Sequence, residues 1–403
     1  MTPTKVALAR RAQLLKPSPI LMLAARAGEL KAAGHDVISL SIGEPDWTPY
    51  ENIKEAAIAS IREGKTKYTP SSGIPELRKA IANQAEKDFG LKYELSEVTV
   101  SSGAKFVLFA ALQALVNPGD EVILIAPFWA SYTTMVELAD GVPKIVVCDR
   151  SVDFKITPAM LKAAIGPKTK AILMNSPSNP TGKIYSAAEL TALADVLRAH
   201  PHVAVISDDI YNRLCFEQKL APHLLQVAPD LQDRVILLNG ASKSYAMTGW
   251  RLGWALGPKA IITAMSSYQS QSVSCANSTA QYAALEAIKG SDADVAKTVV
   301  SLKERYHSLV SEIQKVPGLK AEKAEGAFYL WMDVSNFIGK SLGTTRMATS
   351  DDLSEALLVD QMVAAVPGTE FGLDGYFRLS YALSKERAKE AVQRMAVFFT
   401  KLT

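Results

Sequence analysis

The sequence predicts an α/β fold in which helices cover a mostly parallel β-sheet. Two observations lead to this prediction: seven short apolar runs have the length of strands, and stretches with helical periodicity separate several of them. The runs are predominantly apolar, which is typical of strands that are buried on both faces of a sheet. The predicted strands are 98–100, 122–125, 144–147, 171–174, 203–206, 235–238 and 254–256, and the predicted helices between them are 104–115, 131–139 and 187–199.

The segments on either side of this sheet are mainly helical. Before the sheet, an apolar face that ends at Gly34 predicts one helix, and a second follows it. After the sheet, we expect two long helical stretches and a smaller region of mixed strands and helices, with the domain change near residue 300. The expected elements are helices at 19–34, 52–63, 260–290, 296–315 and 350–361, a strand at 326–333 and a last strand around Arg378.

The composition is that of an ordinary globular protein. The chain has 403 residues, of which 48% are hydrophobic and 21% charged, and this is enough for a sizeable core. The net charge of +3 is small for this size and gives no support for a nucleic-acid or membrane partner. No apolar run approaches the roughly 18 residues that are needed to span a bilayer.

The N-terminal segment has some features of a transit peptide, because it carries Lys5, Arg10 and Arg11 and no acid before Glu29. It lacks the apolar core of a signal peptide, and we expect a cytoplasmic protein. Three cysteines lie far apart in apolar surroundings, so we expect reduced packing residues and no metal site. They are Cys148, Cys215 and Cys275.

One lysine, Lys243, follows the predicted strand 235–238 in the stretch NGASKSYAMTGWRLG (239–253). The small residues around it place an amine at a strand end. Ser242 and Arg251 add a hydroxyl and a guanidinium where a phosphate could bind. An amine beside a phosphate site indicates pyridoxal phosphate, whose aldehyde forms a Schiff base with lysine. A solvated surface lysine is the alternative interpretation.

The pattern S-K-x-x-x-M-x-G-W-R-x-G in this stretch resembles the cofactor-lysine motif of class I aminotransferases of the aspartate aminotransferase type. These belong to the fold-type-I family of pyridoxal-phosphate enzymes, and the resemblance runs from about Lys16 to the C-terminus. It implies a mostly parallel seven-stranded sheet in a large cofactor-binding domain (49–300) and a smaller α+β domain (301–403). Residues 1–48 would form an N-terminal arm and part of the small domain.

Ligands of such sheets bind beyond the carboxyl ends of the strands. Gly103 and Ala104 open the predicted helix 104–115, where free backbone N–H groups and the helix dipole favour an anion. Taken alone, this is a weak signal. Trp129 follows another strand and can either stack on a flat heterocycle or pack in the core. Asn179, in the turn NSPSNPTG, offers an amide N–H group.

By resemblance, Asp208 pairs with the pyridine nitrogen, Tyr211 and Asn179 donate hydrogen bonds to the phenolic oxygen of the cofactor, and Trp129 packs against its ring. A buried carboxylate at Asp208 stabilises the protonated ring, which then withdraws electrons from the substrate. The donors lower the proton affinity of the Schiff base. Lys243, once released, moves a proton between the substrate Cα and the cofactor. We therefore expect Lys243, Asp208 and Tyr211 to be the catalytic residues.

The resemblance also implies a homodimer, because the Tyr68 hydroxyl is expected to reach the cofactor phosphate of the other subunit. Asp209 stands at a position where the family usually carries Glu. The expected cofactor-binding residues are Gly103, Ala104, Trp129, Asn179, Asp208, Tyr211, Ser242, Lys243, Arg251 and Tyr68.

The expected substrate-binding residues are Gly43, Lys105, Trp129, Asn179 and Arg378. Arg378 stands between apolar neighbours and needs a partner, and by resemblance it clamps the α-carboxylate of the substrate. By resemblance, we also expect the backbone of Gly43 to lie against the substrate and Lys105 to face a distal carboxylate. The sequence departs from relatives that read K-P-S-A-T, because Ile20 stands where a threonine hydroxyl would help to hold that carboxylate.

We therefore predict a homodimeric aminotransferase that moves the amino group of aspartate, or a similar amino acid, to 2-oxoglutarate by a ping-pong cycle through a Lys243 Schiff base. Aromatic, aliphatic and prephenate-type substrates stay open, and so does a carbon–sulfur β-lyase on the same fold. A regulatory ligand-binding protein is the alternative from another class. Such proteins carry a DNA-binding module ahead of this fold, and about fifteen residues precede the matching region here.

Overall fold

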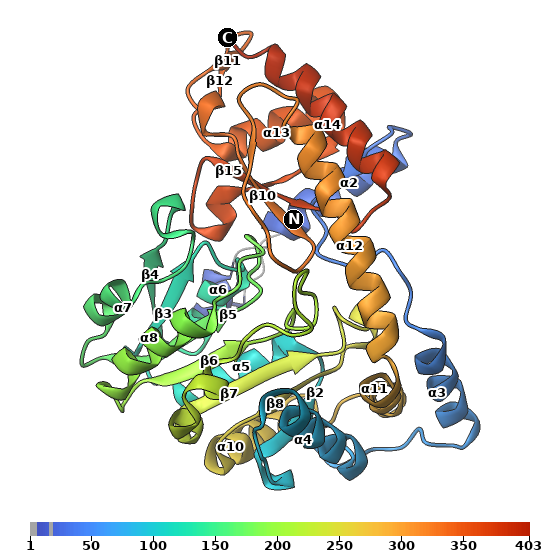
Figure 1. Cartoon of the computed structure of the whole chain (residues 1–403), viewed down its shortest axis with the longest axis vertical. Helices are drawn as coiled ribbons and strands as arrows, with labels where there is room; N and C mark the ends of the chain where they lie inside the picture. The colour runs from blue at the N-terminus through green and yellow to red at the C-terminus, as the bar shows by residue number, and fades with distance from the viewer. Residues whose placement is uncertain (1–5, 16–18) are drawn as a thin grey trace.

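The computed structural model of the chain describes residues 6–15 and 19–403. The first residues of the expected arm, Lys5 among them, and Lys16, where the resemblance begins, lie outside these ranges. The helices before the central sheet are α1 (Arg10–Leu14), α2 (Pro19–Ala32), α3 (Glu51–Arg62) and α4 (Pro75–Phe89). The C-terminus lies at the top of Figure 1.

A seven-stranded sheet forms the centre of the lower half in Figure 1, in the order β2-β8-β7-β6-β5-β3-β4. Its strands are β2 (Val98–Ser101), β3 (Glu121–Ala126), β4 (Val142–Val147), β5 (Thr169–Asn175), β6 (Ala204–Asp208), β7 (Val235–Gly240) and β8 (Gly253–Leu256). β8 is antiparallel to both of its neighbours, and the other neighbouring pairs are parallel. The mostly parallel sheet that the sequence predicts is therefore confirmed. Because β8 reverses between β2 and β7, all six other strands end at the same edge of the sheet.

Six of the seven strands are buried on both faces, as the apolar runs predict, whereas the edge strand β4 is partly exposed, with Val142, Ile145 and Val147 48%, 47% and 50% exposed. Alternate residues of one strand pack on opposite sides: Leu173 joins a core with α5 (Ala104–Leu115), α6 (Ser131–Leu138) and α10 (Lys259–Ser270). Ile172 joins a second core with α7 (Pro158–Ala164), α8 (Ala187–Arg198) and α9 (Leu224–Val227). This packing leaves the carboxyl edge of the sheet as the place for polar side chains.

The predicted continuous helix over 260–290 is wrong, because two helices occupy this range. α10 ends at Ser270 and α11 (Ser278–Gly290) begins after a turn. The Asn277 side chain accepts a hydrogen bond from the Ala280 N–H group at 2.9 Å, which caps the first turn of the new helix. α12 (Asp292–Ile313) also begins earlier than predicted and runs without interruption through residue 300.

The upper half in Figure 1 contains a four-stranded antiparallel sheet in the order β14-β15-β10-β9. Its strands are β9 (Lys320–Ala321), β10 (Tyr329–Asp333), β14 (Val366–Pro367) and β15 (Tyr376–Ser380). α12, α13 (Ser350–Gln361) and α14 (Lys385–Thr400) pack around it in one apolar core. A parallel pair of β1 (Ile38–Ser39) and β13 (Val363–Ala364) joins the N-terminal segment to this half, and a short hairpin of β11 (Ser341–Leu342) and β12 (Thr345–Arg346) completes it.

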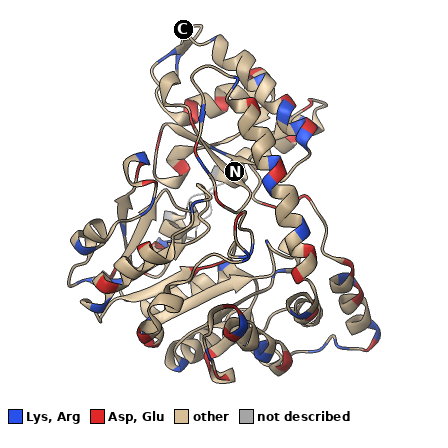
Figure 2. Cartoon of the chain, in the orientation of Figure 1, with Lys and Arg blue, Asp and Glu red and all other residues tan. Residues whose placement is uncertain are grey.

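Charged residues of both signs are interspersed over the outer helices (Figure 2). Within the described residues, no helix is long and apolar enough to cross a membrane, and no group of three or more His, Cys, Asp or Glu side chains could hold a metal ion. Cys148 and Cys215 are buried free thiols, and Cys275 is a half-buried one.

A buried ion-pair cluster ties α12 to the central sheet. Arg213, which follows β6, pairs with Asp88 of α4 and with Asp292 at the start of α12, and the side chains of Arg213 and Asp88 are 6% and 5% exposed. Burial raises the pKa of Asp88 even though Arg213 opposes this shift. Asp88 therefore depends on the guanidinium to stay ionised.

We predict that Arg213→Met lowers the free energy of unfolding by about 3 kcal/mol, because it leaves the Asp88 carboxylate buried without a cation. Lys219→Met is the matched control, since Lys219 pairs with Asp292 from an exposed position and should contribute less than about 1 kcal/mol. Urea unfolding followed by circular dichroism measures both changes. Equal changes in the two variants would contradict a special contribution from the buried pair.

Candidate active site

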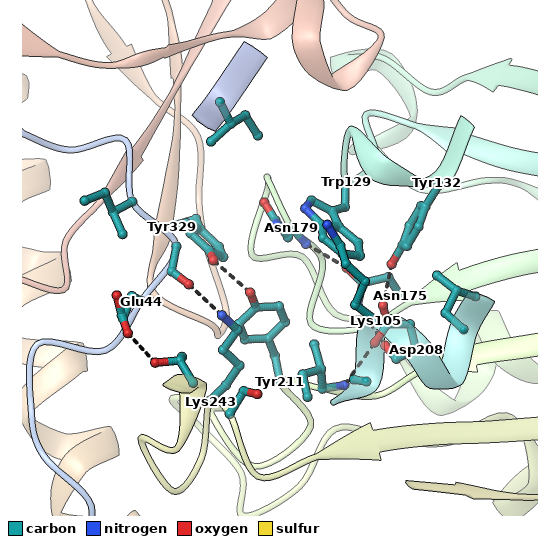
Figure 3. Close-up of a pocket in the computed structure, with 18 of the residues that line it drawn as sticks. Glu44, Lys105, Trp129, Tyr132, Asn175, Asn179, Asp208, Tyr211, Lys243 and Tyr329 are labelled. Atoms are coloured by element: carbon teal, nitrogen blue, oxygen red, sulfur yellow. Dashed lines mark hydrogen bonds between the residues drawn. The ribbon is translucent and has the colours of Figure 1, made fainter. Parts of the chain in front are cut away.

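A cavity of about 490 Å³ lies at the carboxyl edge of the central sheet, where the loop after β1 and strands β10 and β15 face it (Figure 3). It brings together most of the residues that the sequence predicts. The predicted residues that line it are Gly43, Ala104, Lys105, Trp129, Asn179, Asp208, Tyr211, Ser242, Lys243, Arg251 and Arg378. Gly103 lies just behind the lining, and Tyr68 lies away from it.

Lys243 is held in the cavity by the loop that follows β7. Its Nζ atom donates a hydrogen bond to the Gly43 carbonyl oxygen at 2.5 Å. The pKa of Lys243 is lowered to about 8, mainly by burial and in addition by the positive charges of Arg378 and Arg251. Roughly a tenth of the amine is therefore neutral at pH 7, a far larger fraction than for an exposed lysine. This neutral fraction can act as a nucleophile or as a base.

Three groups form an anion site beside this lysine. α5 begins at Ala104 after Gly103, whose φ of 89° favours glycine, and no side chain caps the helix N-terminus. A Cβ atom on Gly103 would lie 2.6 Å from Arg251 Nη2, and one on Gly253 would overlap the Ala104 nitrogen. The two glycines thus allow Arg251 and β8 to lie close to the helix N-terminus. Together with the Ser242 hydroxyl, these groups suit a phosphate.

Asp208 ends β6 and is 6% exposed. Its Oδ2 atom accepts a hydrogen bond from the Tyr132 hydroxyl at 2.6 Å, and Oδ1 accepts one from the Ile210 N–H group at 3.3 Å. Burial raises the pKa of Asp208 to about 6, whereas the two donors oppose this shift. The carboxylate is therefore fixed in direction and costly to ionise unless a cationic group lies against it.

Asp209, the residue after β6, does not line the cavity. Its Oδ1 atom accepts a hydrogen bond from the Ser207 hydroxyl at 2.8 Å, and its Oδ2 atom lies 3.3 Å from His223 Nε2. Burial, with the neighbouring charge of Asp208, raises the pKa of Asp209 to about 8. The paired acids of the sequence thus separate into one that faces the cavity and one that faces the interior.

Arg378, on β15, is 2% exposed and forms no ion pair with any described residue. Nη1 donates to Asn179 Oδ1 at 3.1 Å, Nη2 donates to the Ser41 carbonyl oxygen at 2.5 Å, and Nε has no partner in the described part of the chain. A buried guanidinium without a carboxylate is ready to take one from a ligand. The contact also orients the Asn179 amide, whose Nδ2 group remains available as a donor.

Tyr211 lies beside Arg378 at the back of the cavity. Its hydroxyl is 2.7 Å from the hydroxyl of Tyr329, and both side chains are buried. Figure 3 shows these two rings and the Lys243 amine converging from three different elements. Burial raises the pKa of Tyr211 well above its ordinary value, so the phenol stays protonated and can donate a hydrogen bond.

The outer end of the cavity combines one cation with an apolar wall. Lys105 Nζ lies 4.7 Å from the centre of the Trp129 ring. Burial lowers the pKa of Lys105, and the charge of Arg251 adds to this effect. Ile20, Leu21 and Ile42 supply the apolar wall.

Tyr68 is 91% exposed and does not reach the cavity of its own chain. Buried glutamines nevertheless hold its loop in place. Gln269 donates hydrogen bonds to the carbonyl oxygens of Ser71 and Val100, and Gln281 donates to Thr69 Oγ1 at 3.0 Å. Tyr68 therefore stands on an anchored loop and points away from this chain's core.

Several lining residues escape the prediction from sequence. Tyr132 lies one helical turn after Trp129, and this spacing is the signal that could have identified it. Asn175, whose Nδ2 group donates to the Asp208 carbonyl oxygen at 2.8 Å, opens the NSPSNPTG turn. For three other polar lining residues, local sequence gives no clear signal, because their partners come from distant segments. They are Glu44, Thr248 and Tyr329.

Comparisons with known proteins agree with this geometry. A family model described as aminotransferase class I and II matches residues 35–395. The aspartate/prephenate aminotransferase of Cereibacter sphaeroides is 46% identical over 385 residues, which cover 95% of this chain and 96% of that protein. The aspartate aminotransferase of Rhizobium meliloti is 42% identical over 396 residues, which cover 98% and 97%.

Solved structures show the same fold. The crystal structure of the aspartate aminotransferase from Rhizobium meliloti matches with a TM-score of 0.95 at 41% identity, over 99% of this chain and 100% of that one. The aspartate aminotransferase from Thermus thermophilus with maleate matches with a TM-score of 0.91 at 39% identity, over 97% and 99%. The chain therefore belongs to the class I and II aminotransferase family and is an aminotransferase of the aspartate aminotransferase type.

Proposed function

We propose that the protein uses pyridoxal phosphate bound at Lys243 to transfer the amino group of a dicarboxylic amino acid, aspartate above all, to 2-oxoglutarate. The observation that carries this proposal is the position of the Lys243 amine between an anion site, an oriented buried carboxylate and an unpaired buried guanidinium. Each of these groups suits one part of the cofactor or the substrate.

The residues present fit the cofactor. The α5 N-terminus, Ser242 and Arg251 would hold its phosphate, Asp208 its ring nitrogen, and Tyr211 and Asn179 its phenolic oxygen, with Trp129 against the ring. The uncapped helix N-terminus supports the phosphate assignment, because its N–H groups lack a side-chain acceptor. When bound, pyridoxal phosphate supplies an aldehyde that takes up the amino group and a ring that withdraws electrons from the substrate Cα.

The chain's own residues would then have separate roles in substrate binding and proton transfer. Arg378 and Asn179 hold the α-carboxylate, which fixes the direction of the Cα–H bond relative to Lys243. The Lys243 amine, with its lowered pKa, moves the proton at Cα. Asp208, fixed by Tyr132, keeps a proton on the ring nitrogen.

The choice of a dicarboxylic substrate rests on Lys105, which offers a positive charge at the outer end of the cavity. The related Thermus protein was solved with maleate, itself a dicarboxylate. A prephenate-type substrate is the second candidate, because Ile20, Leu21 and Ile42 form an apolar wall that suits a ring. The name of the Cereibacter relative agrees with this candidate.

We also propose a homodimer in which Tyr68 reaches the cofactor phosphate of the partner subunit, and a cytoplasmic location as expected from the sequence. The anchored loop and the 91% exposure of Tyr68 support the first of these proposals, because a rigidly held aromatic side chain in solvent suits contact with another surface.

The purified protein should form glutamate from 2-oxoglutarate with aspartate as donor, and this assay tests the proposed function directly. A panel of amino donors and acceptors, prephenate included, ranks the substrates. Release of pyruvate, ammonia and a thiol from cysteine conjugates, without glutamate formation, would instead identify a β-lyase.

We predict that Arg378→Leu raises KM and lowers kcat/KM about a hundredfold for every amino acid, because the α-carboxylate loses its charged partner. Cofactor binding should persist, as visible absorption can verify. Arg198→Leu is the control, since Arg198 pairs with Asp230 on the surface. Unchanged kinetics in Arg378→Leu would remove the assignment of this residue.

We predict that Lys105→Ala lowers kcat/KM for aspartate about tenfold or more and leaves that for alanine nearly unchanged, because alanine lacks a distal carboxylate. The ratio of the two values is the measurement, with Lys144→Ala as a control outside the cavity. An equal loss of kcat/KM for aspartate and alanine would indicate that Lys105 instead contributes to phosphate binding or to the stability of the fold.

Mixing two variants that are each defective in cofactor binding tests whether Tyr68 acts across the subunit interface. In a heterodimer of Lys243→Ala and Tyr68→Ala chains, one site combines both defects and the other has wild-type Lys243 and wild-type Tyr68. We therefore predict that mixing restores one normal cofactor site per dimer, measured as cofactor affinity by fluorescence. Affinity no higher than in Tyr68→Ala alone would mean that Tyr68 acts within its own chain or not at all.

A further inference from the structure

The hydroxyl of Tyr329, on β10, lies where three parts of the site meet. It is 2.7 Å from the Tyr211 hydroxyl, and the Arg378 guanidinium lies 4.6 Å from the centre of the Tyr329 ring. Gly43 packs so closely that a Cβ atom there would lie 2.5 Å from the Tyr329 hydroxyl oxygen. Tyr329 is 1% exposed, so these contacts leave its hydroxyl little freedom.

The two phenols have two protons to distribute. Within the described residues, the Tyr211 oxygen is the hydrogen-bond partner of the Tyr329 hydroxyl, and burial raises the pKa of both phenols, so both keep their protons. If the Tyr211 O–H group donates a hydrogen bond to the phenolic oxygen of the cofactor, it cannot also donate one to Tyr329. Tyr329 must then be the donor in the bond between them.

Two O–H groups aligned in one direction strengthen one another. A Tyr211 oxygen that accepts a hydrogen bond from Tyr329 becomes a better hydrogen-bond donor through its own O–H group, and its hydroxyl is held in one orientation. Because Tyr329 belongs to the smaller antiparallel sheet, this bond also links that sheet to β6, which carries Asp208 and leads to Tyr211.

We infer that Tyr329 is a positioning residue that directs the Tyr211 hydroxyl toward the phenolic oxygen of the cofactor and thereby lowers the proton affinity of the Lys243 linkage. The inference rests on the proposed function, because it requires the cofactor at Lys243. It differs from a purely structural role, in which the Tyr329 hydroxyl only satisfies a buried group.

The test is the pH dependence of the visible absorption of the cofactor-loaded protein. Tyr329→Phe should raise the midpoint pH of the absorption change by about half a unit. A weaker hydrogen bond from Tyr211 to the cofactor lets the Lys243 linkage keep its proton to higher pH. The charged groups that face Lys243, namely Arg378, Glu44, Arg251 and Asp208, are the same in the variant. Tyr211→Phe should raise the midpoint further, and the double variant should match Tyr211→Phe alone.

Tyr381→Phe is the matched control, because Tyr381 is equally buried and donates to the Ala327 carbonyl oxygen at 3.2 Å. Its midpoint should equal that of the wild type. As a second measurement, 3-fluorotyrosine at position 329 keeps the bond with a more acidic donor, so it should lower the midpoint. A structural disturbance would not reverse the sign in this way.

An unchanged midpoint in Tyr329→Phe, or a double variant whose shift is the sum of the two single shifts, would overturn the inference while the proposed function stands. A wild-type protein that never acquires the absorption band would instead overturn the proposed function, and the inference with it.

Discussion

An excess of positive charge around one cavity is the constraint on which the rest of the structure depends. Among the described residues, four cationic side chains line it, namely Lys105, Lys243, Arg251 and Arg378, and two carboxylates, Glu44 and Asp208, stand among them. Arg378 is buried without a carboxylate partner in the described chain, and burial together with neighbouring cations lowers the pKa of Lys243. Such a site is costly until anions enter it. A phosphate and the carboxylates of an amino-acid substrate would neutralise it.

The fold supports this arrangement because it places apolar and polar side chains in different regions of the sheet. The inner parallel strands are mainly apolar on both faces, so the polar side chains gather where the strands end. The reversal of β8 brings the end of β2, and with it the N-terminus of α5, to the same edge as Asp208 and Lys243. The antiparallel sheet closes the other side with Arg378 and Tyr329. The site is therefore made by two sheets that the sequence separates by many residues.

Local sequence was enough to predict the strands of the central sheet and the functional residues that follow them. The apolar runs predicted strands with two buried faces, and Lys243, Asp208 and Asn179 each follow such a run. Sequence was not enough to separate α10 from α11, because neither Gly nor Pro marks the turn at 271–277 and the capping contact of Asn277 is a detail of one side chain. Tyr132 and Tyr329 also escaped, because each acts through a partner that lies 76 or 118 residues away. Tyr68 stays a prediction, since its expected partner is another subunit.

The central claim is that the Lys243 amine binds the aldehyde of pyridoxal phosphate. Incubation of the purified protein with pyridoxal phosphate, reduction with borohydride and peptide mapping by mass spectrometry test this claim most directly. The account predicts one modified residue, Lys243, with a mass increase equal to the reduced cofactor, and no such label in Lys243→Ala. A protein that stays colourless and unlabelled at Lys243, or a label that remains in Lys243→Ala at a similar level, would contradict it.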